Sequence, residues 1–197
     1  MQLHWPAPER NKGPILAVLQ RVLPAQGTLL ELASGTGQHA VFFAQALPGW
    51  RYLPSDIGPE NLASIRAYRE QVQLPNLLAP RTLDVRAADW QVGELDAVYN
   101  ANMLHISPWE CTEALLRGSA RHLRQHGQLI LYGPFRMAGQ HTSESNQQFD
   151  ADLRAQDARW GVRDLEDIVA SAETCGLQLR ERVALPANNL CLVLARV

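Results

Sequence analysis

The sequence has few of the groups that cross-link a protein, anchor it in a membrane or bind a metal. Its three cysteines, Cys111, Cys175 and Cys191, stand far apart and match neither a disulfide framework nor zinc-ligand spacing, which favours a reducing compartment. No apolar run approaches the roughly 18 residues that a membrane span needs. The N-terminus lacks the basic and apolar regions of a signal peptide. We therefore expect a cytoplasmic protein with no metal site and no membrane contact.

An excess of charge of either sign is also missing. The 18 basic and 20 acidic residues leave a formal net charge of −2, whereas binding to nucleic acid generally relies on a basic surplus that neutralises phosphates. Lysine occurs only once, at Lys12, where it would either face solvent or reach an anionic ligand. The near-neutral balance favours a small-molecule partner, and no nucleic-acid partner is expected.

What the chain does contain is a regular alternation of strand and helix patterns. Short apolar segments predict parallel strands buried on both faces, and longer segments repeat apolar residues at helical spacing. The predicted strands are residues 27–33, 50–56, 81–85, 95–100 and 128–132, and the predicted helices are residues 15–23, with Pro14 in the first turn, 38–47, 59–72 and 107–125. This alternation predicts an open α/β sheet with right-handed crossovers and helices on both faces.

Local signals predict the two ends of the fourth helix. Ser107 and Glu110 form a capping box at its start. Gly127 suits a left-handed stop at its end. His122 and His126 would then share a face of the last turn, where cationic side chains favour the helix dipole. A metal site is the alternative for this histidine pair, but no third ligand is evident, and we interpret the pair as structural.

The last 60 or so residues follow a different pattern. Residues 137–146 are polar and predict a loop, and residues 147–157 and 164–175 are helix candidates. The segments 177–185 and 190–197 predict strands, and the short link between them allows only an antiparallel hairpin. The whole chain is expected to be one domain, with an N-terminal helical segment (1–26), a binding core (27–135) and a final part containing a loop, two helices and the hairpin (136–197).

A glycine-rich turn between the first strand and the next helix predicts a ligand site. Gly35 and Gly37 permit a tight turn and close approach of a ligand, and the helix that follows presents free N–H groups. The pattern Gly35-x-Gly37-x-x-Ala40 also fits a dinucleotide fingerprint, so a small NAD-binding protein stays open as an alternative. Glu31 argues against it, because a carboxylate before the turn repels a pyrophosphate but suits a cationic amino group.

Further motifs stand at the ends of the predicted strands. They are Glu31-Leu-Ala-Ser-Gly35-Thr-Gly37, Asp56, Asp84-Val85 and the segment from Asp96 to His105. With these motifs the chain resembles the class I S-adenosylmethionine-dependent methyltransferases over nearly all its length. Through segments that include Ala33 to His39, Thr142 to Asn146 and Pro186 to Asn189, it is more closely similar to a methyltransferase-like family classed as a domain of unknown function (family nine-three-eight). The resemblance implies a Rossmann-like, seven-stranded, mostly parallel sheet.

The resemblance also implies S-adenosylmethionine as the cofactor. Glu31 would orient its amino end and Asp56 its ribose, while Asp84 and the Val85 N–H would meet the adenine. The full implied binding set is Glu31, Ala33, Ser34, Gly35, Gly37, Asp56, Asp84, Val85, Asn100 and Ala101. The usual methyltransferase turn has a glycine where this chain has Ala33. Alanine is small enough that ligand approach should survive, provided that its φ stays negative.

The chemistry that follows from the resemblance is methyl transfer to a small-molecule acceptor. The sulfonium already activates the methyl group, so the protein must mainly orient the acceptor, and a base is needed only for an unionised one. His105 is the first candidate base, Asn102 would position the acceptor, and His141 would act from the loop after the fifth strand. His105 as a capping or packing residue and His141 as an exposed one remain alternatives. A further alternative is a non-catalytic protein that binds S-adenosylmethionine as a sensor or partner protein.

Overall fold

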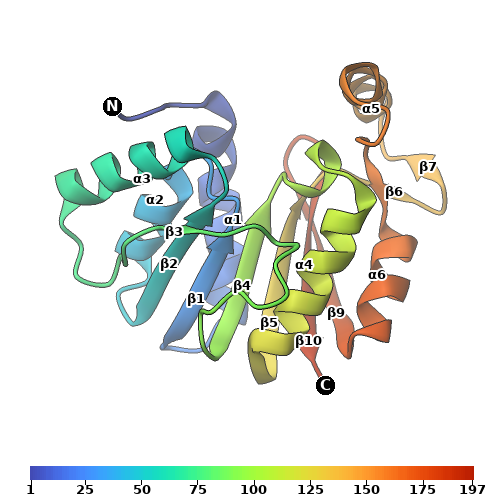
Figure 1. The fold of residues 1–197 in the computed structure, drawn as a ribbon. Coiled ribbons are helices and arrows are strands. Elements are labelled where there is room, and N and C mark those ends of the chain that lie inside the picture. The colour runs from blue at the N-terminus through green and yellow to red at the C-terminus, as the bar shows by residue number, and fades with distance from the viewer.

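The computed structural model describes residues 1–197, and its centre is a β-sheet with helices on both faces (Figure 1). The helices are α1 (Pro6–Val22), α2 (Gln38–Ala46), α3 (Pro59–Val72), the 3-10 helix η1 (Leu104–Ile106), α4 (Trp109–His122), α5 (Glu144–Gln156) and α6 (Leu165–Thr174). The strands are β1 (Gly27–Leu32), β2 (Trp50–Asp56), β3 (Arg81–Thr82), β4 (Leu95–Ala101), β5 (Leu123–Gly133), β6 (Phe135–Met137), β7 (Gln140–His141), β8 (Arg163–Asp164), β9 (Leu177–Leu185) and β10 (Asn189–Arg196).

The main sheet has seven strands in the order β3-β2-β1-β4-β5-β10-β9. Strands β1 to β5 run parallel, and β10 pairs antiparallel with both β5 and β9. The predicted seven-stranded sheet with its antiparallel hairpin is thereby confirmed. A second, three-stranded sheet in the order β7-β6-β8 lies beside α5 and α6 (Figure 1).

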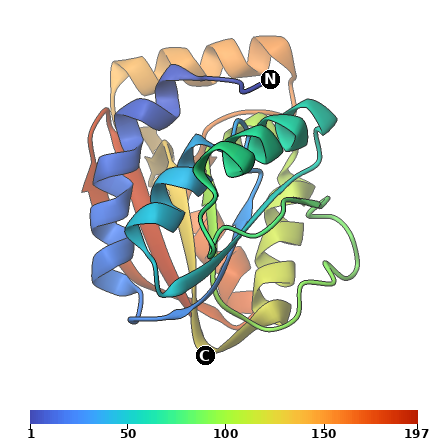
Figure 2. The same ribbon diagram turned by 90° about the vertical axis from the view of Figure 1, so that its left-hand side faces the viewer.

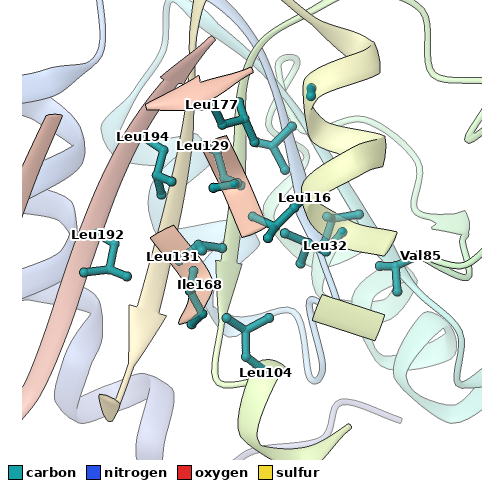
Figure 3. Close-up of a cluster of buried hydrophobic side chains, with 14 of the residues drawn as sticks. Leu32, Val85, Leu104, Leu116, Leu129, Leu131, Ile168, Leu177, Leu192 and Leu194 are labelled. Atoms are coloured by element: carbon teal, nitrogen blue, oxygen red, sulfur yellow. The ribbon is translucent and has the colours of Figure 1, made fainter. Parts of the chain in front are cut away.

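Each face of the main sheet is covered by a hydrophobic core of its own. Leu29 of β1 is buried with Phe43 of α2 on one face. Its neighbour Leu30 is buried on the other face with Leu116 of α4. Figure 3 shows part of this second core, where Leu116 of α4 and Ile168 of α6 lie among leucines of the strands. Because successive strand residues point to opposite faces, a strand covered on both sides requires the continuous apolar run that β1 has.

Helix α1 begins nine residues earlier than the sequence pattern predicts. Its first turns carry polar residues, so the apolar period becomes visible only from Ile15 onward. Pro14 therefore lies inside the helix rather than in its first turn, and the carbonyl of Arg10 receives no helical hydrogen bond from it. At 17 residues α1 is the longest helix, and no helix in the chain is both long and apolar enough to cross a bilayer.

The junction between α4 and β5 also differs from the prediction. Helix α4 ends at His122, and β5 begins at the next residue because its first residues already pair with β4. The left-handed residue is His126, with φ 65°, and not Gly127. His122 and His126 therefore share no helical face; His122 Nε2 instead lies 3.0 Å from Asp89 Oδ1. A Cβ at Gly127 would lie 2.9 Å from the carbonyl oxygen of Arg124, so this glycine serves close packing.

The predicted capping box at Ser107 is not formed. Helix α4 begins at Trp109 with Pro108 as its N-cap residue and without a side-chain cap. Ser107 Oγ donates to the carbonyl of Met103 at 2.9 Å, a bond that closes the turn of η1. The sequence pattern does not predict η1. Because the Ser107 hydroxyl bonds to η1, it does not cap α4.

Two other boundaries are shorter or more structured than predicted. Strand β3 contains only Arg81–Thr82, so Asp84 and Val85 lie in the loop that follows it. The predicted loop over residues 137–146 holds the end of β6, all of β7 and the first residues of α5. The remaining predicted strands and helices are present within a few residues of their expected ends.

Candidate active site

The carboxyl ends of the parallel strands open into a cavity of about 1000 Å³. The N-terminal segment and α5 lie at this same end of the main sheet (Figures 1 and 2). Most residues of the predicted site line the cavity: Glu31, Ala33, Ser34, Gly35, Asp56, Asp84, Val85, Ala101, Asn102 and His105. The topology therefore brings together side chains from β1, β2, β4 and the loops after them, as expected for ligand sites in open α/β sheets.

Asp56 holds the glycine turn from the end of β2. The N–H of Gly35 donates to Asp56 Oδ2 at 2.8 Å. Asp56 Oδ1 accepts from the N–H of Gly58 at 2.8 Å and from Asn61 Nδ2 at 3.1 Å. The carboxylate is buried and fixed in orientation, and Asp56 lines the cavity. Oδ2 accepts one hydrogen bond within the protein and has the capacity to accept a second from a ligand hydroxyl.

Ala33 does not keep the negative φ that we expected. Its φ is 53°, because the chain must turn out of β1 so that Ser34 can bond to β2. There the N–H of Ser34 donates to the carbonyl of Ser55 at 2.8 Å, and Ser34 Oγ accepts from the N–H of Ser55 at 3.1 Å. A left-handed alanine costs about 1–2 kcal/mol, which these two hydrogen bonds offset. Ala33 still lines the cavity.

Glu31 is a buried carboxyl group at the base of the turn. Only 2% of the residue is exposed, and Oε2 has no hydrogen-bond partner in the protein. Its other oxygen, Oε1, lies 3.9 Å from His39 Nδ1. Burial raises the pKa of Glu31 to about 8. A buried charged group without a partner is unfavourable, so the geometry suits a cationic ligand group that would pair with this oxygen.

A polar network beside Glu31 was not anticipated from the sequence. His39 Nε2 lies 2.7 Å from Asn11 Oδ1, and His39 Nδ1 lies 3.3 Å from Tyr99 Oη. Burial lowers the pKa of His39 to about 4, so the ring is neutral and donates through Nε2 to the amide oxygen of Asn11. Asn11, His39 and Tyr132 all line the cavity. The available signal was the presence of polar residues on the core-facing sides of α1 and α2.

Asn102 and His105 meet at the end of β4. A Cβ built on Gly133 of β5 would lie 3.6 Å from both Asn102 Oδ1 and His105 Nδ1, so the two side chains lie over the same glycine. The ring of His105 packs edge-on against Phe149 of α5 with centroids 5.3 Å apart. Burial, aided by the charge of Arg163, lowers the pKa of His105 to about 4. The imidazole is therefore neutral at physiological pH and can accept a proton.

Asp84 lies at the cavity with its carboxylate already paired. Arg86 Nη2 donates to Asp84 Oδ2 at 2.6 Å, and Arg86 Nε lies 3.0 Å from Oδ1. This hydrogen bonding lowers the pKa of Asp84. A ligand amino group that approached Asp84 would share the carboxylate with Arg86.

Three predicted residues do not line the cavity. Gly37, with φ 92°, begins α2, and a Cβ there would lie 3.0 Å from the Cα of Ile65, so it allows α2 to pack against α3. Asn100 is fully buried and donates from Nδ2 to the backbone of β1 at 2.9 Å. His141 lies on β7, where its Nε2 is 3.5 Å from Asp150 Oδ2. In these contacts Gly37 allows close helix packing, Asn100 links β4 to β1, and His141 has a partner outside the cavity.

The fold matches solved structures of methyltransferases. An O-methyltransferase family protein from Burkholderia thailandensis superposes with a TM-score of 0.82 at 16% identity over 96% of this chain and 57% of that chain. For human N-acetylserotonin methyltransferase in complex with SAM the TM-score is 0.79, at 15% identity over 96% and 52%. The mitomycin 7-O-methyltransferase MmcR superposes with a TM-score of 0.79 at 15% identity, over 97% of this chain and 54% of that chain. The chain thus spans little more than half the length of these proteins.

These matches identify the architecture as the Rossmann-like class I methyltransferase fold. The family model described as "Protein of unknown function (DUF938)" matches residues 2–196. The chain belongs to the DUF938 family.

Proposed function

We propose that the protein transfers a methyl group from S-adenosylmethionine to a small-molecule acceptor. The observation that carries this proposal is Glu31, whose buried Oε2 lacks a partner and borders a cavity beside the glycine turn. This oxygen would pair with the ligand's amino group, and Asp56 Oδ2 would accept from a ribose hydroxyl. When bound, S-adenosylmethionine supplies a methyl group that is already activated by its sulfonium.

The charges around the turn support this cofactor over a dinucleotide. Three acidic side chains, those of Glu31, Asp56 and Asp84, line the same half of the cavity. Asp84 is already paired with Arg86, and Glu31 and Asp56 offer a pyrophosphate no positive charge. The N–H of Gly35, which a phosphate would require, already donates to Asp56. A cationic ligand instead fits both the unpartnered oxygen and the acidic lining.

Two neutral side chains would handle the acceptor. Asn102 would orient it by hydrogen bonding, and His105 would receive its proton during the transfer. Formation of a buried imidazolium is normally unfavourable. Here His105 gains its charge as the sulfonium loses its own, so the number of positive charges in the cavity does not change.

Isothermal titration with S-adenosylhomocysteine, the demethylated product, tests cofactor binding. The wild-type protein is expected to bind it, and Glu31→Gln should bind at least about tenfold more weakly, because a hydrogen bond to a charged group contributes about 1.5–3 kcal/mol. Glu94→Gln, a change at an exposed glutamate, is the matched control and should bind normally. Absence of binding at millimolar ligand, or unchanged affinity in Glu31→Gln, would refute the proposal.

Labelled methyl transfer then separates an enzyme from a non-catalytic sensor. We expect label from S-adenosylmethionine to enter small molecules of a metabolite extract, and Asn102→Ala to lower the rate without changing cofactor affinity. Binding without transfer to any component of the extract would favour the sensor.

A further inference from the structure

The large apolar side chains that remain exposed in this chain are few and gather in one place. Apart from the two terminal residues, Met1 and Val197, they are Trp5 at 47%, Ile57 at 59%, Ile106 at 45% and Phe149 at 38% exposed. All four of these internal residues line the cavity. Contiguous exposed apolar surface on a folded protein generally marks a binding site.

The four residues come from four separate parts of the chain, so no single amphipathic helix accounts for them. Trp5 belongs to the N-terminal segment, Ile57 follows β2, Ile106 lies in η1 and Phe149 lies on α5. They converge only because the fold places these segments around the same opening. Their exposure is therefore a property of the cavity mouth.

The apolar residues divide between two halves of the cavity. Trp5 lies over the glycine turn, since a Cβ on Gly35 would come within 2.8 Å of its ring, and Ile57 directly follows Asp56. These two belong to the half that we assign to the cofactor. Ile106 directly follows His105 and Phe149 packs on its ring, so these two belong to the half that we assign to the acceptor.

The charges differ between the two halves in the same way. The acidic side chains of the lining are those of Glu31, Asp56 and Asp84, all in the cofactor half, where Arg86 pairs with Asp84 at 2.6 Å; Arg10 also lines the cavity. On the acceptor side, the lining includes Arg159, which is paired with Asp157 at 2.7 Å and so neutralised. No carboxylate is available there to hold a cationic acceptor.

On the basis of the proposed function, we infer that the methyl acceptor is an uncharged molecule with an apolar, ring-containing body and a hydroxyl group. Its body packs between Ile106 and Phe149, and its hydroxyl lies against Asn102 and His105. The hydroxyl oxygen forms a bond to the methyl carbon as the carbon–sulfur bond breaks. The electron pair of that bond stays on sulfur, and His105 takes the hydroxyl proton.

The test is titration of 1-naphthol into the protein saturated with S-adenosylhomocysteine, followed by calorimetry. The wild-type protein should bind 1-naphthol, and Phe149→Ala should bind it about fivefold to tenfold more weakly with unchanged affinity for S-adenosylhomocysteine. Val197→Ala, which trims an exposed apolar side chain outside the cavity, should bind both ligands as the wild type does. 1-Naphthylmethylamine, which carries an ammonium group on a methylene attached to the same ring system, should bind at least tenfold more weakly than 1-naphthol.

The outcomes separate this inference from the proposed function. Normal binding of S-adenosylhomocysteine without binding of 1-naphthol, or equal binding of 1-naphthol and 1-naphthylmethylamine, would overturn the inference alone. Binding of 1-naphthol that depends on Phe149, in a protein that does not bind S-adenosylhomocysteine, would overturn the proposed function and leave the apolar site standing.

Discussion

The two halves of the cavity are built on different physical principles. The cofactor half contains all the acidic side chains of the lining, and its turn is held by hydrogen bonds such as the one from Gly35 N–H to the side chain of Asp56. The acceptor half is neutral and apolar, and it is assembled from η1 and α5, which are distant in sequence. The first half binds charge at fixed positions, whereas the second offers shape and an apolar surface.

This contrast predicts that substitutions in the two halves have different consequences. Residues of the cofactor half also hold the sheet and its turns together, so substitutions there affect folding as well as binding. Phe149 of the acceptor half is 38% exposed and belongs to neither hydrophobic core, so its substitution should leave both cores intact.

The largest effect is expected from the titration of Glu31. Its pKa is about 8 in the folded protein against an ordinary 4.5, so the fold retains this proton longer than the unfolded chain does. Stability from this group is therefore fully present below about pH 4.5 and is lost as the pH rises through about 8, by roughly 3–5 kcal/mol in total. Glu31→Gln should abolish that loss when free energies of unfolding are measured by urea denaturation between pH 5 and 9.

For Glu31 the control is Glu94→Gln, which should keep the wild-type pH dependence. If Glu31→Gln also retained the wild-type pH dependence, the carboxyl group of Glu31 would not be buried and neutral in the folded protein. The cofactor half would then lack a buried, unpartnered carboxyl group.

Asp56→Ala should destabilise the fold by roughly 3 kcal/mol and abolish cofactor binding. The variant leaves the N–H of Gly35 and of Gly58 without their charged acceptor, and each such bond contributes about 1.5–3 kcal/mol. Chemical denaturation and titration with S-adenosylhomocysteine measure the two effects. Asp152→Ala, at an exposed position on α5, should change neither. If Asp56→Ala were as stable as the wild type and bound S-adenosylhomocysteine normally, Asp56 would neither hold the glycine turn nor contribute to the ligand site.

His105→Gln should reduce the rate of methyl transfer about a hundredfold without weakening cofactor binding. Glutamine fills similar space but cannot take a proton, which confines the change to the acceptor half. Since the pKa of His105 is about 4, the wild-type contribution from this residue should be constant above about pH 5 and fall at lower pH. His126→Gln, at an exposed position, is the control. A rate that is unchanged in His105→Gln would leave His105 as a packing residue.

The smallest effect is expected from Ala33→Gly. Removing the left-handed strain of alanine should stabilise the fold by at most about 1 kcal/mol, since glycine loses more backbone entropy on folding. Ala138→Gly, at another left-handed position that does not line the cavity, should behave alike in thermal unfolding. Affinity for S-adenosylhomocysteine should stay within twofold in both variants. A large loss of stability in Ala33→Gly would mean that its methyl group has an essential packing role.

The cofactor half could be predicted from the sequence because its residues stand at strand ends. The apolar runs fix where each parallel strand stops, and Gly35, Asp56 and Glu31 are read directly from those stops. Local sequence patterns did not predict the backbone conformation of the turn. The left-handed φ of Ala33 follows from its hydrogen-bonded neighbour Ser34, whose partner Ser55 belongs to another strand.

The acceptor half was harder to predict because its parts meet only in three dimensions. Asn102 and His105 were expected from their place after β4, but nothing in the sequence places Phe149 of α5 against His105. Asn11 lines the cavity from the polar first part of α1. That part of the helix has no apolar periodicity, so the sequence pattern did not predict it as helical. The lowered pKa of His105 likewise depends on burial by elements that are remote in the chain.

The most direct test of the account is the number of protons released when S-adenosylhomocysteine binds at pH 7. Glu31 is mostly protonated there in the free protein, and pairing with the ligand's amino group requires its ionised form. Calorimetry in buffers of different ionisation enthalpy should therefore record close to one proton released by the wild-type protein and none by Glu31→Gln. Equal proton release by the two proteins would contradict the assignment of Glu31 to the cofactor's cationic end.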